Sequence, residues 1–154
     1  RWAAYCDMNV IQLVPVNDTG SESSPYSARS AFALNPAFIN VQNVQGSSEY
    51  EAEIEEAKEE FDELGKVDYY RIVKWKRKIL KKIFDDHYDD LKKDKQLAEW
   101  IKHNQWAKPY CVYATLKARN SEASWRDWKN YQNPTDKDVE KLWTKFQKDC
   151  MFQA

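Results

Sequence analysis

The most conspicuous group of chemically active side chains lies around His87. The imidazole is flanked on both sides by pairs of carboxylates, namely Asp85, Asp86, Asp89 and Asp90. Such a group could bind a metal ion or act as an acid/base pair. The spacing, however, is not the H-E-x-x-H of a zinc helix, and the cluster ends a predicted amphipathic helix. We therefore interpret it as a solvated helix end and predict no metal site and no catalytic residue there.

The remaining histidine and the cysteines also carry no recognisable motif. His103 is predicted to lie at a helix end, and Cys111, in an aromatic stretch, is predicted to be a buried inert thiol. The chain has three cysteines, Cys6, Cys111 and Cys150, which are scattered and form no C-x-x-C pair. This argues against a disulfide framework and favours a reducing compartment, most simply the cytoplasm. No nucleophile elbow, P-loop or dinucleotide fingerprint occurs, so no cofactor is predicted.

Two tryptophans could bind a sugar by stacking. Trp125 and Trp128 are three residues apart in Ser124-Trp-Arg-Asp-Trp128. On a helix, side chains at this spacing share a face. Packing in the core or at a domain interface is the commoner reason for such a pair, and it is the interpretation that we favour.

The loop Ser23-Ser-Pro-Tyr-Ser27 is the best functional candidate. The ring of Tyr26 could stack on a sugar face while its hydroxyl bonds sugar hydroxyls. Ser24 and Ser27 offer short donors and acceptors. The alternative is an ordinary turn around Pro25, and spacing alone leaves both interpretations open.

The elements before this loop look like part of a sheet. Met8-Asn-Val-Ile-Gln-Leu-Val-Pro-Val16 is apolar and β-branched with little alternation, which is typical of a strand buried on both faces. The polar loop Asn17–Ser27 follows it. If the strand belongs to a (β/α) barrel, this loop leaves the strand at the end where barrel active sites are built. One strand cannot form a sheet, so residues 1–46 require partners that the chain does not visibly contain.

From Ser47 onward the apolar period becomes helical. The pattern predicts an acidic helix over about 48–64, with Ser48 and Glu51 as a capping box and Gly65 as its stop. A basic helix is predicted over about 68–88, packed antiparallel on the first. Further helices are predicted at about 94–103, 108–119 and 135–151, with Pro109 in a first turn and Thr135-x-x-Asp138 as a cap. We therefore divide the chain into residues 1–46 and a helical unit, 47–154.

Composition narrows the possible partners. The 154 residues fit one domain or a fragment of a larger one. With 24 basic and 25 acidic residues the chain lacks the basic surplus of a nucleic-acid binder. No apolar run approaches the roughly 20 residues that cross a bilayer, so no membrane partner is expected. The chain starts at Arg1 and stops without a cap at Ala154, so we expect an internal fragment.

Several segments resemble one enzyme family. Gln12–Thr19 and Ser24–Pro36 are similar to a strand ending in Leu-Pro, a Ser-Pro-Tyr loop and Ser-x-Phe-Ala-x-Asn/His-Pro of the amylomaltases and disproportionating enzymes, the 4-α-glucanotransferases of glycoside hydrolase family 77. The resemblance continues in Val67–Leu80, which looks like the family's Val-Asp-Tyr helix. Pro109–Lys117 and Ser124–Trp128 resemble further family segments, so the similarity is collinear over nearly the whole chain.

The resemblance implies an α/β fold, here a fragment of a (β/α)8 barrel with a large α-helical insertion, mostly α by residue count. The family transfers α-1,4-glucan segments between maltodextrins through a covalent intermediate, with retention, which requires two carboxyl groups. In the family these lie on later strands, beyond Ala154, and no acidic residue here matches them. The resemblance therefore implies no catalytic residue in this chain, which alone would be inactive.

The resemblance also implies site residues and partners. Ser24 and Tyr26 would contact acceptor-side sugars of a maltodextrin, whereas Asn35 and Pro36 look structural. Asn17-Asp18 and Ser27 are similar to the longer disproportionating-enzyme branch rather than the short bacterial form. The expected partners are α-1,4-glucan and the remainder of the barrel. Two alternatives stay open: a stand-alone helical module that binds glucan or protein, and a relic of the enzyme without activity.

Overall fold

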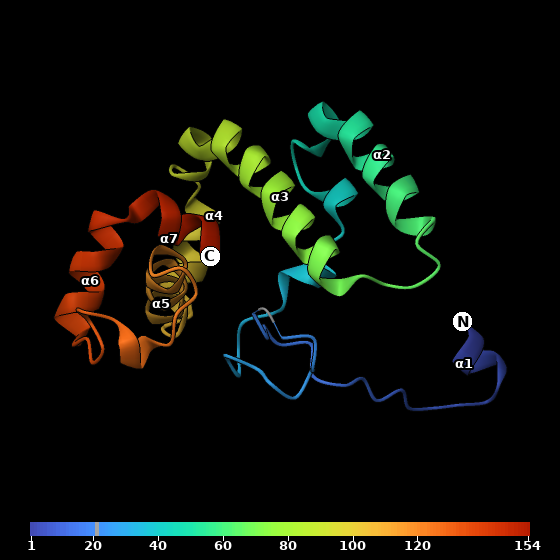
Figure 1. Ribbon diagram of the computed structural model, residues 1–154, viewed down its shortest axis with the longest axis horizontal. Coiled ribbons are helices and arrows are strands. Elements are labelled where there is room, and N and C mark those ends of the chain that lie inside the picture. Colours follow the sequence, from blue (N-terminus) through green and yellow to red (C-terminus); the bar gives the residue numbers. More distant parts are fainter. Residues whose placement is uncertain (21) are drawn as a thin grey trace.

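The computed structural model describes residues 1–20 and 22–154. Ser21, which belongs to the predicted polar loop, lies outside the described residues. The described chain is mostly helical, as predicted (Figure 1). Its α-helices are α1 (Trp2–Tyr5), α2 (Glu51–Asp62), α3 (Tyr69–Leu91), α4 (Lys95–His103), α5 (Ala107–Arg119), α6 (Asp136–Lys145) and α7 (Gln147–Gln153). None of the helices formed by the described residues is both long enough and apolar enough to cross a membrane.

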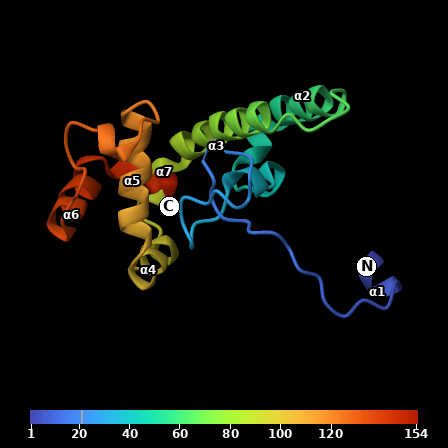
Figure 2. The same cartoon turned by 60° about the horizontal axis from the view of Figure 1, so that its bottom comes forward.

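The predicted strand at 8–16 does not form in this structure, and the described residues show helices without a sheet. Within residues 1–20 and 22–154 the pairing between extended segments is a single antiparallel bridge, Asn17 to Leu34. Residues 8–16 run extended away from the helices, ending near the distant α1 (Figure 2). Their apolar side chains stay exposed, for example Val10 at 80% and Leu13 at 73%. A strand needs a neighbour for its backbone hydrogen bonds, and no described segment pairs with residues 8–16.

The first long helix begins differently from the prediction. Ser47–Tyr50 forms a 3-10 turn (η3), and Tyr50 is the residue that caps α2, without a side-chain hydrogen bond. The predicted capping box of Ser48 and Glu51 is therefore wrong. The second helix is confirmed: α3 starts directly after Asp68, whose carboxylate accepts the backbone N–H of Arg71 at 3.0 Å.

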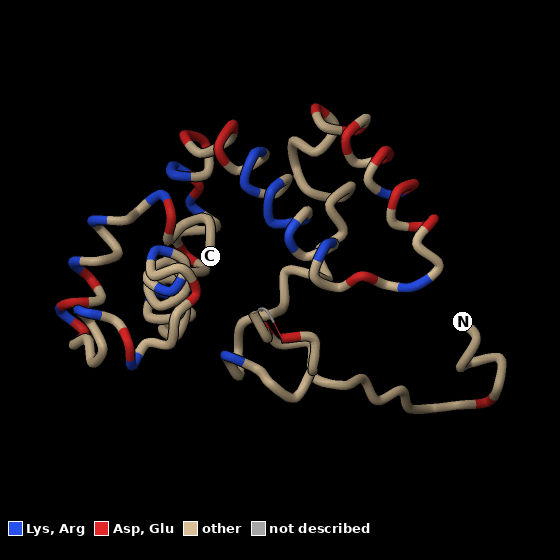
Figure 3. The backbone as a smooth tube through the Cα atoms, viewed as in Figure 1, with Lys and Arg blue, Asp and Glu red and all other residues tan. Residues whose placement is uncertain are grey.

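Helices α2 and α3 run antiparallel, as predicted (Figure 1), and share an apolar cluster. Its buried members are Val41, Ile54, Ile79 and Ile83, and Val44, Tyr50 and Trp75 pack against them. The rings of Phe61 and Trp75 meet edge to face at 6.0 Å. Acidic residues follow α2 and basic residues follow α3 (Figure 3), and two ion pairs join them, Lys82 to Glu53 and Arg71 to Glu60. Such exposed pairs contribute only about 0–1 kcal/mol each, so the apolar cluster holds the helices together.

A second cluster joins the C-terminal helices. Its buried members are Cys111, Val112, Leu116, Trp128, Leu142 and Cys150. The single helix predicted over 135–151 is broken at Phe146, which has φ −116° and ψ 34°, so that α7 turns back against α5 (Figure 1). The predicted cap is confirmed, because Thr135 Oγ1 accepts from Asp138 N and the Asp138 carboxylate accepts from Thr135 N.

Candidate functional site

The candidate loop contains a tight turn with its tyrosine exposed. Ser27 N donates to the carbonyl oxygen of Ser24 at 3.1 Å, which closes a four-residue turn. Pro25 occupies the second position, where its fixed φ favours the turn. Tyr26 takes the third position with 77% of its surface exposed, while Ser24 is half-buried. The ring of Tyr26 is therefore accessible to a ligand.

Asp18 closes the base of this loop. Its backbone N–H donates to the carbonyl of Ala33 at 2.8 Å, and its own carbonyl accepts from Arg29 N at 2.7 Å. These two bonds bring both ends of the loop together. The carboxylate of Asp18 is buried and its Oδ1 accepts from Gly20 N at 2.8 Å. One residue thus fixes the backbone on each side of the loop.

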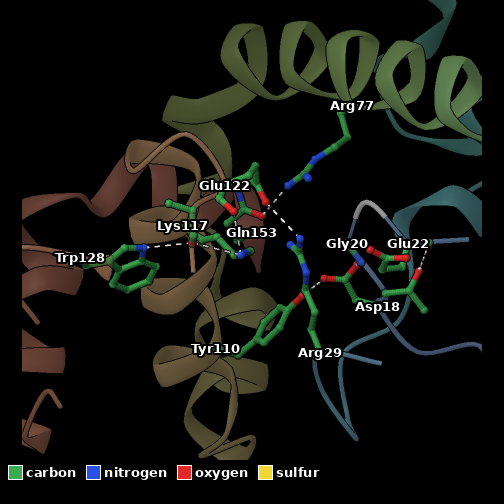
Figure 4. Close-up of polar contacts among 12 residues, drawn as sticks. Asp18, Gly20, Glu22, Arg29, Arg77, Tyr110, Lys117, Glu122, Trp128 and Gln153 are labelled. Carbon is green, nitrogen blue, oxygen red and sulfur yellow. Dashed lines mark hydrogen bonds and ion pairs between the residues drawn. The ribbon is translucent and has the colours of Figure 1, made fainter. Parts of the chain in front are cut away.

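The second carboxylate oxygen of Asp18 is bound from the helical unit. The hydroxyl of Tyr110, on α5, donates to Asp18 Oδ2 (Figure 4). Burial, followed by this hydrogen bond to a carboxylate, raises the pKa of Tyr110 well above its usual value. The phenol therefore stays a neutral donor throughout the physiological pH range. Helix α5 holds the entry of the loop in this way.

A second tyrosine binds the loop from α3. Asn35 and Thr19 are only 4% and 3% exposed. Asn35 Nδ2 lies 2.7 Å from Tyr69 Oη and 3.1 Å from Thr19 Oγ1. Asn35 Oδ1 accepts from Ala37 N at 2.9 Å and so caps the 3-10 turn η1 (Pro36–Phe38). These bonds agree with a structural role for Asn35.

Arg29 provides a third link between the loop and the helices. Its guanidinium donates to the Glu122 carboxylate at 3.1 Å, just after α5 (Figure 4). The same guanidinium lies directly over Gly20, where an added Cβ would overlap it. Gly20 also has φ +65°, which favours glycine. Asp18, Arg29, Tyr69 and Tyr110 were not predicted as site residues, because nothing in their spacing indicates that they meet.

The His87 cluster differs from its prediction. His87 lies inside α3, which continues to Leu91, and its side chain is only 31% exposed. Its Nε2 is buried, has no hydrogen-bond partner among the described residues and lies 3.9 Å from Glu49 Oε1. The four aspartates around it are exposed in the last two turns of α3, as expected for a solvated helix end, so the interpretation is wrong for His87 only. Among residues 1–20 and 22–154, no three His, Cys, Asp or Glu side chains gather closely enough to hold a metal ion.

The other candidates behave largely as predicted. His103 is exposed in the last turn of α4, where Nδ1 lies 2.8 Å from the Glu99 carbonyl oxygen. Cys111 is 1% exposed, and burial raises the pKa of its thiol to about 12. The two tryptophans separate: Trp128 is 4% exposed in the core, whereas Trp125 is 40% exposed under the guanidinium of Arg126. The packing interpretation is thus confirmed for Trp128 only.

A cavity of about 760 Å³ adjoins the base of the loop. Asp18 and Asn35 lie on one wall, and helices α3, α4, α5 and α7 supply the others. Much of the remaining lining is apolar and aromatic, including Phe32 and Trp106, whose rings stack at 5.6 Å. Sequence patterns gave no indication of this cavity, because its walls come from segments far apart in the chain.

Comparisons with known proteins agree on one family. The family model described as 4-alpha-glucanotransferase matches residues 1–154. The chain is 28% identical over 149 residues to 4-alpha-glucanotransferase DPE2 of Oryza sativa subsp. japonica, covering 92% of this chain and 16% of that protein. It is 27% identical over 143 residues to the 4-alpha-glucanotransferase of Clostridium butyricum, covering 92% of this chain and 29% of that protein.

A shorter stretch is more similar still. Over 43 residues, 28% of this chain and 8% of the relative, the identity to the 4-alpha-glucanotransferase of Chlamydia pneumoniae is 44%. The chain thus spans less than a third of the length of each of these relatives. No solved structure matches the chain. Because the family model matches the whole chain, the protein belongs to the 4-alpha-glucanotransferase family, glycoside hydrolase family 77.

Proposed function

We propose that this chain forms part of a 4-α-glucanotransferase that transfers α-1,4-glucan segments between maltodextrins with retention. The observation that carries the proposal is the family match over residues 1–154. Within that enzyme, we assign residues 1–46 to a barrel strand and a substrate loop, and residues 47–154 to a helical insertion. The coverage of the relatives supports this assignment, since the matched segment makes up only 16% and 29% of their length.

The exposed N-terminal segment supports incorporation into a barrel. Apolar side chains on 8–16 are 38% to 80% exposed, and such a run is normally covered in a folded protein. Further strands of the barrel would cover both faces and satisfy the backbone. The alternative, a stand-alone module that binds glucan or protein, would leave this segment exposed. The observation therefore favours the enzyme over the module.

We assign glucan contact to Tyr26 and Ser24. An exposed tyrosine ring provides a flat apolar face for a pyranose ring, and its hydroxyl and that of Ser24 bond sugar hydroxyls. Retention requires two carboxyl groups about 5–5.5 Å apart, one as nucleophile and one as acid/base. The nearby carboxylate of Asp18 is committed to Gly20 and Tyr110. We therefore expect the catalytic pair on later strands, outside residues 1–154.

We further expect a reducing compartment such as the cytoplasm. Cys6, Cys111 and Cys150 are all free thiols. Disulfides are common in oxidising compartments and rare where glutathione keeps thiols reduced. Locating the enzyme by antibody labelling in cells and in subcellular fractions tests whether it lies in such a compartment.

The experiment that tests the glucan assignment substitutes Tyr26→Ala in the transferase that contains this segment. We expect kcat/KM for maltotriose disproportionation to fall about tenfold or more, because a stacking face and a hydroxyl are both lost. Tyr70→Ala is the matched control, since Tyr70 is 66% exposed on α3 and lies outside the loop. Unchanged kinetics for Tyr26→Ala would remove Tyr26 from the site. Equal losses in both variants would indicate a general effect on the fold.

A further inference from the structure

The loop that carries Ser24 and Tyr26, here called the glucan-contact loop, is held by side chains of the helical unit as well as by its own backbone. Asp18 stands at the loop entry, where it is buried. Its backbone N–H and C=O bind Ala33 and Arg29, and its carboxylate binds Gly20 and Tyr110. Only the last of these bonds reaches outside the loop region. The Asp18–Tyr110 bond therefore links α5 directly to the loop entry.

The surroundings of Tyr110 make this bond well suited to hold a fixed position. Tyr110 is half-buried on α5, beside Cys111 and Val112 of the C-terminal core, so its own backbone is rigidly supported. The acceptor is a carboxylate, and a hydrogen bond to a charged group is stronger than one between neutral groups. Arg29 adds a parallel connection to Glu122 at 3.1 Å, on the same side of the loop. Glu122, however, is 44% exposed, so this ion pair is weaker.

We propose that Tyr110 is a positioning residue for the glucan-contact loop: its hydroxyl, bound to Asp18, fixes the geometry in which Ser24 and Tyr26 meet the sugar. The proposal rests on the assigned contact between this loop and glucan. It gives the helical unit a specific task, which is to hold a substrate loop of the barrel part. Loss of the hydroxyl frees the loop without removing any group that touches the substrate.

The consequence for binding follows from the entropy of the loop. A loop that samples several conformations must be ordered when the ligand binds, and that ordering reduces affinity. Removing one charge-assisted hydrogen bond is expected to raise the fraction of molecules in which the loop has left this position by about tenfold or more. Maltodextrin affinity should fall by a similar factor, although Tyr26 and Ser24 are unchanged.

The first measurement follows the loop itself, by amide hydrogen exchange in the 154-residue chain. In Tyr110→Phe we expect exchange of residues 22–30 to rise about tenfold, while α5 keeps its protection. Tyr113→Phe is the control, because Tyr113 lies on the same helix and its hydroxyl makes no hydrogen bond with the described residues. Unchanged exchange in the loop of Tyr110→Phe would overturn the proposal.

The second measurement compares maltoheptaose affinity in the same proteins, and in Tyr26→Ala, by titration calorimetry. We expect Tyr110→Phe to bind about tenfold more weakly, Tyr113→Phe to bind like wild type, and Asp18→Asn, which keeps an acceptor for Tyr110, to fall between them. A loosened loop with wild-type affinity would overturn the positioning role, because a purely structural bond predicts that result.

The two proposals fail in different ways. If Tyr26→Ala leaves maltoheptaose affinity unchanged, the glucan assignment of the loop is wrong, whatever Tyr110→Phe does. If Tyr26→Ala weakens binding and Tyr110→Phe does not, the glucan assignment stands and the positioning role of Tyr110 is wrong. Losses in both variants, with increased exchange in the loop of Tyr110→Phe, support both.

Discussion

Gly46 and His87 are packed against each other, Gly46 in the turn before α2 and His87 near the C-terminal end of α3. A Cβ on Gly46 would overlap the imidazole Nε2 of His87. Gly46 also has φ +86°, a region that side chains of L-residues rarely adopt. The contact holds the connection at 44–47 on α3, next to the apolar cluster of Ile54 and Ile79. The His87 side chain therefore has a packing role, and this role does not depend on the aspartates next to it in the sequence.

Gly46→Ala should destabilise the chain more than Gly65→Ala does. Gly65 has φ +64° but open space around its Cβ position, so its substitution costs only the backbone strain, about 1 kcal/mol. At position 46 the overlap with His87 adds to a similar strain. Urea unfolding followed by tryptophan fluorescence measures both variants. Equal free energies of unfolding for the two would show that His87 moves aside at no cost.

The sequence predicted those parts of the fold whose determinants are local. Helix α3 and the cap of α6 depend on neighbouring residues, such as Asp68 with Arg71 and Thr135 with Asp138, and both were predicted correctly. The strand at 8–16 was not, because a strand is stabilised by partner strands and the described part of the chain supplies none. The break at Phe146 was missed for a related reason, since it follows from how α7 packs on α5.

The candidate site was predictable only in part. The turn at Ser24–Ser27 carries its own signal in Pro25, and the sequence indicated it. The residues that hold the loop were not predictable, because Asp18 and Tyr110 meet only after α5 has packed. No periodicity links two residues so far apart. The glucan contact of Ser24 and Tyr26 stays a prediction until the Tyr26→Ala kinetics are measured.

Alkaline pH should destabilise the chain partly through Tyr110. Its pKa is raised above the usual 10.0 in the folded chain, so its contribution to stability is complete below about pH 10. That contribution is lost as the pH rises from 10 toward the higher folded-state pKa, because the unfolded phenol ionises first. Tyr110→Phe should therefore lose stability less steeply than wild type above pH 10. Urea unfolding at pH 9, 10 and 11 measures the difference, and parallel slopes would contradict it.

Tyr50 should also lower the stability of the chain at alkaline pH, because its pKa is raised in the same direction. The hydrogen bond to Asp86, followed by partial desolvation, raises the pKa of Tyr50 to about 12. Tyr50→Phe should also flatten the decrease in stability above pH 10, and the variant with both substitutions should be flattest. Because Tyr50 lies near the surface, its effect should be the smaller of the two. A larger effect for Tyr50→Phe than for Tyr110→Phe would contradict the role given to burial.

One thiol should react in the folded chain and three after unfolding. Cys6 is exposed, whereas Cys111 and Cys150 are buried and burial raises the pKa of both thiols. The thiolate is the reactive form, so both core cysteines should resist modification. Titration with a chromogenic disulfide reagent, before and after adding guanidinium chloride, counts the accessible thiols. Rapid reaction of a second thiol in the native chain would mean that the contact between α5 and α7 opens readily.

Leu142→Ala should be among the costlier substitutions in the helical unit. Leu142 is 1% exposed at the centre of the cluster that joins α5, α6 and α7. Truncation there leaves a cavity and should lower the free energy of unfolding by about 2–5 kcal/mol. Leu13→Ala is the control, because Leu13 is 73% exposed and its truncation should be nearly neutral. Comparable losses at both positions would show that Leu13 is buried in solution.

Thr135→Ala should remove the cap of α6 in a pH-dependent way. At pH 7 the loss should be about 1 kcal/mol, as for other N-cap residues. Hydrogen bonds from the hydroxyl and backbone N–H of Thr135 hold the pKa of Asp138 below its usual 3.8. The Asp138 carboxylate contributes fully to the free energy of unfolding above that value, and this contribution is lost as the pH falls through the lower folded-state pKa. The difference in free energy of unfolding between Thr135→Ala and wild type should therefore shrink toward pH 2.

The matched control for this cap is Thr144→Ala. Thr144 lies inside α6, and its hydroxyl donates to the Glu140 carbonyl at 3.0 Å, a bond that adds little to a helix. Alanine is also the better helix former, so this variant should be as stable as wild type or slightly more stable. Circular dichroism during urea unfolding at pH 7 and pH 2 measures all three proteins. A loss in Thr135→Ala that is equal at both pH values would mean that the Asp138 carboxylate does not contribute to the cap.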